Sequence, residues 1–278
     1  MKNIALPTDF SKNSENAIDY ALNLFKDEAC RFYLLHTYTP IIYSYDFNMS
    51  AGNYADDVSE MVKKNAEERL KSQLKKLNKK HKNDKHSFEL VTSFNTLTDE
   101  LKSFTKKHDI ELIVMGTKGA SGAQEVLFGT NTIHVINKVK CPVMAIPNEY
   151  KFEPPVDILF PTDYKIDYDD KHLNIIKAIA LNFKSKIHIV HVTSDELNYE
   201  QSKNSVTLER LLLEYDDVYE TVRDDYIPEA INSYQNQNQT QLLAMINNKH
   251  SFFENLFFKP VISRISLHLK TPFLVIPS

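Results

Sequence analysis

Residues 112–147 read LIVMGTKGASGAQEVLFGTNTIHVINKVKCPVMAIP, and residues 242–277 read LLAMINNKHSFFENLFFKPVISRISLHLKTPFLVIP. The two stretches align without a gap, and eight of their 36 positions are identical. A second match lies upstream of each, where residues 4–10 (IALPTDF) resemble residues 158–164 (ILFPTDY). Two matches in the same order indicate that the chain is an internal duplication.

Each copy alternates short apolar runs with segments of helical periodicity. The apolar runs predict ten strands, at 2–7, 31–37, 87–93, 110–115 and 142–147, and at 157–161, 186–192, 218–222, 241–246 and 273–277. Between the strands of the first copy, apolar residues at helical spacing predict four helices, with contact faces within 17–25, 58–77, 97–104 and 133–139. Ser11 or Asn13 would cap the first of these helices. The glutamine- and asparagine-rich run 235–241 is expected to be a polar loop.

This alternation predicts an α/β fold of two tandem doubly wound domains, each a five-stranded, mainly parallel sheet with about four helices. The polar, proline-bearing stretch 148–155 suits a linker. We therefore expect one domain at 1–148, called here the first half, and another at 156–278, called the second half.

Composition narrows the class of protein. The chain opens directly into strand-like sequence, and no stretch approaches the ~20 apolar residues of a membrane span, which predicts a cytoplasmic protein with no membrane partner. The two cysteines, Cys30 and Cys141, lie in apolar patterns and are expected to be buried, reduced thiols.

Charge argues against a nucleic-acid partner. Residues 151–278 carry 13 Lys and Arg against 18 Asp and Glu, so the second half is acidic. The lysine-rich run 63–85 shares its segment with an apolar stripe, which indicates a docked helix with a solvated face, although a nucleic-acid patch is the alternative.

Glycine use marks one segment of the chain. Four of the five glycines fall within 116–129, in the form Gly116-x2-Gly119-x9-Gly129-Thr130, and the second half has none. Glycines let backbone N–H groups approach a phosphate closely, and a helix that begins near Thr130 would add free amides and its positive dipole end. The hydroxyls of Thr130 and Thr132 could add donors. The segment therefore predicts a phosphate site, with a tight loop as the plain alternative.

Residues suited to a ligand also follow other strands. Ligands of open parallel sheets bind beyond the carboxyl ends of the strands, where residues 7–9 and 36–37 are expected. Asp9 could accept hydrogen bonds from a ribose or cap a helix with equal reason, and Lys118 could add positive charge. A histidine at such a strand end, like His36, is more often a partly buried structural residue than a ligand or a catalyst.

The glycine pattern, the strand that ends in Pro-Thr-Asp and the closing Cys-Pro-Val-x-x-Ile-Pro together resemble the universal stress protein family in its tandem two-domain form. The resemblance implies a Rossmann-like fold related to the adenine-nucleotide α-hydrolases, and ATP or a related adenine nucleotide as ligand. It places Pro7, Thr8 and Asp9 by adenine and ribose and Thr37 near the base. The ribose and phosphates would contact Met115, Gly116, Gly119, Gly129, Thr130, Asn131 and Thr132.

Members of the family are mostly regulators of stress survival rather than strong enzymes. The closing strand commonly pairs domains, so residues 143–147 and 273–277 are expected to pair within this chain. A homodimer and an unidentified regulatory protein partner are further expectations. Mg²⁺ usually accompanies a nucleoside triphosphate.

The second half departs from the glycine pattern. Gly116, Gly119 and Gly129 are replaced by Ile246, Lys249 and Lys259. Pro260 follows, which removes a helix-start N–H donor, and a cluster of phenylalanines spans 252–258. We expect this half not to bind ATP in the family manner, and to serve structure or a partner instead.

Two further functions remain as alternatives: a weak ATP-hydrolysing enzyme and a ligand-free interaction scaffold. The chain lacks the Gly-x4-Gly-Lys-(Ser/Thr) loop, and no Ser/His/Asp order or paired carboxylates stand out as a catalytic set. These observations favour a nucleotide-binding regulator over an enzyme.

Overall fold

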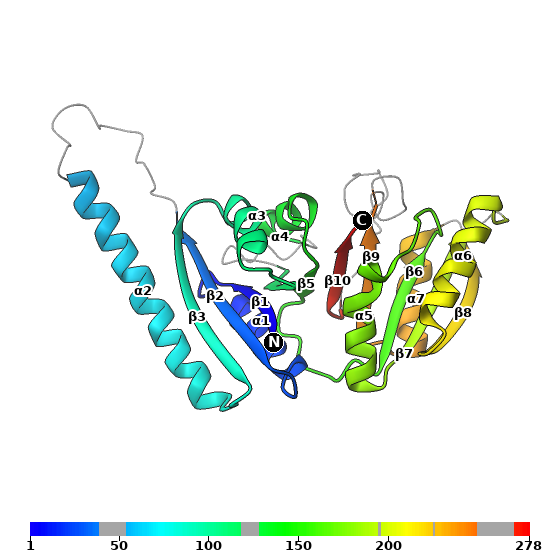
Figure 1. Ribbon diagram of the computed structural model, residues 1–278, viewed down its shortest axis with the longest axis horizontal. Coiled ribbons are helices and arrows are strands. Elements are labelled where there is room, and N and C mark those ends of the chain that lie inside the picture. The colour runs from blue at the N-terminus through cyan, green and yellow to red at the C-terminus, as the bar shows by residue number, and fades with distance from the viewer. Residues whose placement is uncertain (39–53, 118–127, 194–195, 225, 249–269) are drawn as a thin grey trace.

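The computed structural model describes residues 1–38, 54–117, 128–193, 196–224, 226–248 and 270–278 (Figure 1). The elements of the first half are β1 (Lys2–Pro7), α1 (Lys12–Leu24), β2 (Cys30–Tyr38), α2 (Tyr54–Lys80), β3 (His86–Phe94), α3 (Leu97–Lys107), β4 (Leu112–Gly116), α4 (Thr130–Lys138) and β5 (Val143–Ile146). Those of the second half are β6 (Asp157–Thr162), α5 (Asp170–Phe183), β7 (Lys186–Thr193), α6 (Tyr199–Leu212), β8 (Asp216–Arg223), α7 (Ile227–Asn238), β9 (Leu242–Asn247) and β10 (Phe273–Pro277). All ten predicted strands are therefore confirmed.

The strands form one ten-stranded sheet in the order β3-β2-β1-β4-β5-β10-β9-β6-β7-β8. Read outward from the centre, the halves repeat the same order, and all pairs within each half are parallel. The two halves meet where β10 pairs antiparallel with β5, with Leu274 opposite Met144. This pair confirms the expected contact between 143–147 and 273–277, and the doubly wound α/β fold is the predicted one.

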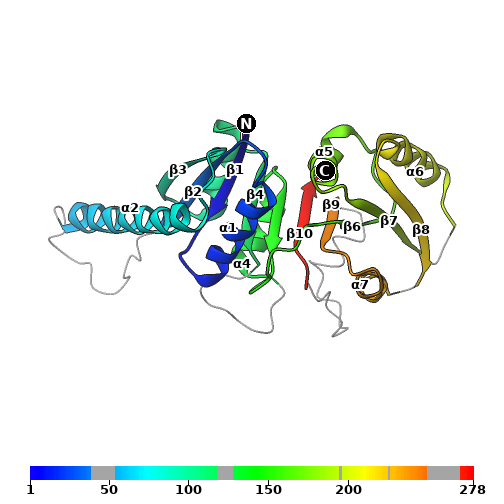
Figure 2. The same ribbon diagram turned by 90° about the horizontal axis from the view of Figure 1, so that it is seen from below.

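Helices cover both faces of the sheet. The core on one face contains residues of α1, α2, α5 and α6, and the core on the other face contains residues of α3, α4 and α7. Figure 2 shows this division in the second half, where α5 and α6 lie on one side of the strands and α7 on the other. Both cores include residues of both halves, so the hydrophobic interior is continuous across the β5–β10 junction. The fourth helix expected in the second half falls on 249–269, outside the described residues.

Two local predictions were wrong. The glutamine- and asparagine-rich run is mostly helical, because α7 continues to Asn238 and ends at Gln239 in the left-handed conformation. Tyr234 and Gln235 face the interior there, so tertiary burial outweighs the polar composition. On α2, Met61 is 66% exposed although it lies on the expected apolar stripe, and Leu70 and Leu77 make the buried contacts.

The expected cap of α1 and the expected burial of both cysteines are confirmed. Ser11 is the cap of α1, since its hydroxyl accepts a hydrogen bond from the Ser14 N–H at 3.2 Å. Cys30 and Cys141 are free and buried, and burial raises the pKa of each thiol to about 12. No helix in the described part of the chain has the length and apolar character needed to cross a membrane.

Candidate functional site

A pocket opens at the carboxyl ends of β1, β2 and β4, where the strand order reverses between β1 and β4. Its volume is about 130 Å³. Eight of the residues predicted from the sequence line it: Pro7, Thr8, Asp9, Thr37, Met115, Gly116, Asn131 and Thr132. The structure thus brings together segments that are more than 100 positions apart in the sequence.

Two of the predicted residues that the structure describes do not line this pocket. Gly129 and Thr130 lie next to it, at the start of α4. Lys118 and Gly119 lie outside the described residues. Three lining residues were not among the predicted contacts: Ser14, His36 and Leu97. No sequence pattern marks Ser14 and Leu97. Each lies in the first turn of a helix, and the sequence does not show that these turns face the pocket.

The loop after β1 is held by its own side chains. The Thr8 hydroxyl accepts a hydrogen bond from the Phe10 N–H at 3.0 Å, and Asp9 Oδ1 accepts one from the Ser11 N–H at 3.0 Å. Phe10 adopts a φ of 62°, a left-handed conformation that is uncommon outside glycine. Asp9 is exposed, is not the cap of α1, and lines the pocket.

His36 ties the end of β2 to this loop. Its Nδ1 lies 2.8 Å from the Thr8 carbonyl oxygen, so Nδ1 carries the proton and donates it. The His36 ring packs on the Phe10 ring, with 4.5 Å between centroids. The Arg69 guanidinium lies over the Phe10 ring, 4.0 Å from its centroid. Burial lowers the pKa of His36 below its ordinary value, and the positive charge of Arg69 acts in the same direction. The imidazole is therefore neutral at neutral pH.

The carboxyl end of β4 is joined to the start of α4. The Thr132 hydroxyl donates to the Gly116 carbonyl oxygen at 3.0 Å and is 3.3 Å from that of Thr117. The donor expected from Thr132 is thus used within the protein. Gly129, the N-cap residue, has no side chain to cap the helix, and its own N–H donates to the Thr117 carbonyl at 2.7 Å. The first amides of α4 therefore lack the side-chain cap that Ser11 gives α1.

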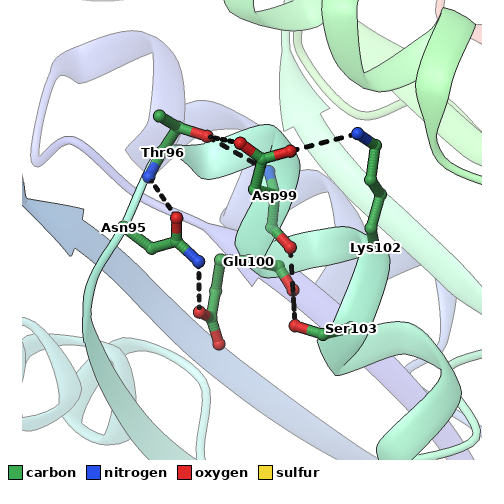
Figure 3. A network of polar contacts seen from close by, with 6 residues as sticks. All are labelled: Asn95, Thr96, Asp99, Glu100, Lys102 and Ser103. Atoms are coloured by element: carbon green, nitrogen blue, oxygen red, sulfur yellow. Dashed lines mark hydrogen bonds and ion pairs between the residues drawn. The ribbon is translucent and has the colours of Figure 1, made fainter.

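A network of side chains closes the turn between β3 and α3 (Figure 3). The Thr96 hydroxyl accepts from the Asp99 N–H at 3.2 Å, and the Lys102 ammonium lies 3.0 Å from Asp99 Oδ1. Glu100 Oε2 accepts from Ser93 Oγ at 2.6 Å and from Asn95 Nδ2 at 3.3 Å. These bonds position α3, which contributes Leu97 to the pocket.

Comparison with known proteins identifies this arrangement. The sequence model of the universal stress protein family matches residues 1–147. A universal stress protein of Methanocaldococcus jannaschii is 30% identical over 154 residues, which are 54% of this chain and 84% of that protein. The chain belongs to the universal stress protein family.

Two solved structures share the fold over the whole chain. A universal stress protein from Archaeoglobus fulgidus DSM 4304 superimposes with a TM-score of 0.69 at 18% identity, over 99% of this chain and 96% of that one. A putative universal stress protein from Pseudomonas aeruginosa UCBPP-PA14 gives a TM-score of 0.56 at 9% identity, over 100% and 93%. The universal stress protein fold therefore extends through both halves.

The second half of this universal stress protein repeats the β1 loop almost bond for bond. Thr162 Oγ1 accepts from the Tyr164 N–H at 3.0 Å, Asp163 Oδ1 accepts from the Lys165 N–H at 3.1 Å, and His191 Nδ1 lies 2.9 Å from the Thr162 carbonyl. Tyr164 also has a positive φ, of 54°. The shared geometry shows that this loop forms with or without the glycine segment.

What surrounds the second loop is different. The hydroxyl of Tyr168, which is 5% exposed, hydrogen-bonds to Thr162 Oγ1. In the first half the corresponding Thr8 hydroxyl contacts the small Ser14 at 3.1 Å. Ile246 occupies the place of Gly116, and its side chain is 8% exposed. Bulky side chains therefore occupy positions that are small in the first half.

Proposed function

We propose that this universal stress protein binds an adenine nucleotide, ATP first among them, in the pocket of the first half. The observation that carries the proposal is that pocket itself, in which the Pro-Thr-Asp loop meets Gly116 and the amino end of α4, whose N-cap residue provides no side-chain cap. Free helix amides and close backbone approach are the features by which proteins bind phosphate. Family membership supports the same ligand class.

Each wall of the pocket suits one part of a nucleotide. The exposed Asp9 carboxylate would accept hydrogen bonds from ribose hydroxyls, Thr37 would contact the base, and Met115 would contact the ribose and phosphates. The volume of about 130 Å³ is below the roughly 300–1,000 Å³ of most ligand pockets, so the phosphates would extend toward Gly129 and Thr130. Lys118 and Gly119 would complete the phosphate contacts.

A magnesium ion would come with the triphosphate. The described residues include no group of three or more His, Cys, Asp or Glu side chains placed to hold a metal. The phosphate oxygens and water would then supply most of the ligands of Mg²⁺, as is common for this ion.

The chain is further proposed to be two domains, 1–148 and 156–278, of which only the first binds nucleotide. Tyr168 and Ile246 support this asymmetry, since both place side-chain volume where the first half has little. The protein would act as a cytoplasmic regulator rather than an enzyme, with the second half serving structure or a partner.

Native mass spectrometry of the freshly purified full chain tests the proposal. We expect a co-purified adenine nucleotide, or a shift by one ATP per chain on titration with ATP. A mass that stays unshifted at millimolar ATP would contradict nucleotide binding and favour the ligand-free scaffold.

A further inference from the structure

Residues of the second half near the β5–β10 junction contact α4, the helix that begins beside the pocket. Helix α4 spans nine residues, about 13 Å at 1.5 Å per residue, so its two ends are close to one another. Its last carbonyl groups have no partner within the helix. One of them, the Ile136 oxygen, accepts a hydrogen bond from the Asn247 Nδ2 at 3.3 Å. The donor is a side chain of the second half.

A second contact fixes the other end of α4. Phe128 comes directly before the N-cap residue Gly129 and is 3% exposed. Its ring lies against Phe273, with 6.0 Å between centroids and 33° between planes. Phe273 belongs to β10, is 0% exposed, and stands opposite Ala145 in the β5–β10 pair. Both ends of α4 are thus held by strands of the second half.

The place of Asn247 in the duplication is informative. It corresponds to Thr117, the residue that follows Gly116 where the glycine segment of the first half starts. In the second half the same strand end, on β9, instead carries a side chain that reaches α4. The position at which the glycine segment begins in the first half therefore contacts α4 of the first half when it is occupied by Asn247 in the second half.

We infer that the second half positions α4 for the nucleotide, with Asn247 as a positioning residue for the site of the first half. The inference rests on the proposed nucleotide binding. Helix amides bind phosphate only when they point at it, and a short helix held at both ends keeps that direction. The half without the glycine segment is then a permanent structural partner of the nucleotide site.

The test compares two aspartate variants of the full chain. Asn247→Asp keeps the shape of the side chain but removes its donor and places a negative charge at the carbonyl end of α4. Asn238→Asp is the matched control, because Asn238 Nδ2 donates to the Tyr234 oxygen of α7 at 3.2 Å, entirely within the second half. ATP affinity is measured by calorimetry, and stability by thermal unfolding.

We expect ATP to bind Asn247→Asp about three- to tenfold more weakly than wild type, the range set by one lost hydrogen bond. Asn238→Asp should keep wild-type affinity even if its unfolding temperature falls. Equal affinity of wild type and Asn247→Asp would overturn the inference, and so would equal weakening in both variants.

Hydrogen exchange of the α4 amides in the nucleotide-free protein separates this inference from the proposed function. Faster exchange in Asn247→Asp than in Asn238→Asp is expected from the contact alone. If wild type binds no ATP, the proposed function fails. If the α4 amides exchange at the same rate in both variants, the positioning role fails whatever the ligand is.

Discussion

Gly129 has ordinary extended backbone, with φ −65° and ψ 155°, so it is not required there by its conformation. A side chain at this position would instead project beside the first amides of α4. We expect Gly129→Val to weaken ATP binding about tenfold or more, because a branched Cβ keeps phosphate from those amides. Calorimetry checks the affinity, and circular dichroism checks that the fold is kept. Unchanged affinity in a folded Gly129→Val would remove Gly129 from the site.

His36 makes a prediction about pH. Its pKa is lowered in the folded protein, so below pH ~6.5 the unfolded chain takes up a proton that the folded chain resists. Stability should therefore fall as pH drops through that range. His36→Asn keeps a donor for the Thr8 carbonyl but does not titrate, so its free energy of unfolding should fall less than that of wild type between pH 7.5 and 5.5. Urea unfolding at both pH values measures the free energy of unfolding. An equal change between the two pH values in wild type and His36→Asn would contradict the prediction.

At the level of single residues, the sequence predicted most of the pocket. Pro7, Thr8 and Asp9 were found because they follow a strand, and Gly116 because glycine is rare elsewhere in the chain. The direction of the Thr132 hydroxyl could not be predicted, since it depends on how closely α4 approaches the end of β4. The role of Tyr168 in the second half was missed for a similar reason. The sequence does not show that the hydroxyl of this loop tyrosine hydrogen-bonds to Thr162 Oγ1.

Helix α3 depends on its cap. Thr96 accepts the Asp99 N–H, and Asp99 and Glu100 place negative charge at the amino end of the helix. Thr96→Ala should lower the free energy of unfolding by about 1 kcal/mol, while Thr96→Ser, which keeps the hydroxyl, should lose only a few tenths. Urea unfolding compares the two. Equal losses in both variants would show that the methyl group, and not the cap, is what matters.

Elements were predicted well where burial is strong and poorly where it competes with composition. The central strands are apolar on both faces, so their sequences stand out without alternation. Residues 235–238 read as a loop by composition, yet Ala230, Ile231 and Tyr234 hold α7 in the core and carry the helix through them. A sequence alone does not show which helix with few apolar residues will be packed against a sheet.

The whole molecule is joined through a shared interior. Val143 and Val275 stand opposite each other in the β5–β10 pair, and both belong to one core that spans the halves. We expect a single cooperative unfolding transition in calorimetry, because the cores of the two halves are continuous across the β5–β10 junction. Two resolved transitions would contradict this account of the junction.

A variant at the junction sharpens that expectation. Val275 is 2% exposed, and Val275→Asp would bury an unpaired carboxylate at a cost of several kcal/mol. The unfolding temperature of the entire chain should fall. Leu181→Asp is the control, since Leu181 is 76% exposed on α5 and its replacement should change the temperature little. A large effect of Leu181→Asp, or none of Val275→Asp, would count against a common core.

The central claim is that a duplicated chain keeps one nucleotide site. Asp9 and Asp163 offer the matched pair to test it, because each carboxylate accepts the N–H two residues ahead, at 3.0 and 3.1 Å. ATP titration of the full chain by calorimetry should give one site per chain, lost or weakened about tenfold or more in Asp9→Ala and unchanged in Asp163→Ala. Two sites per chain, or equal weakening by both substitutions, would contradict the account.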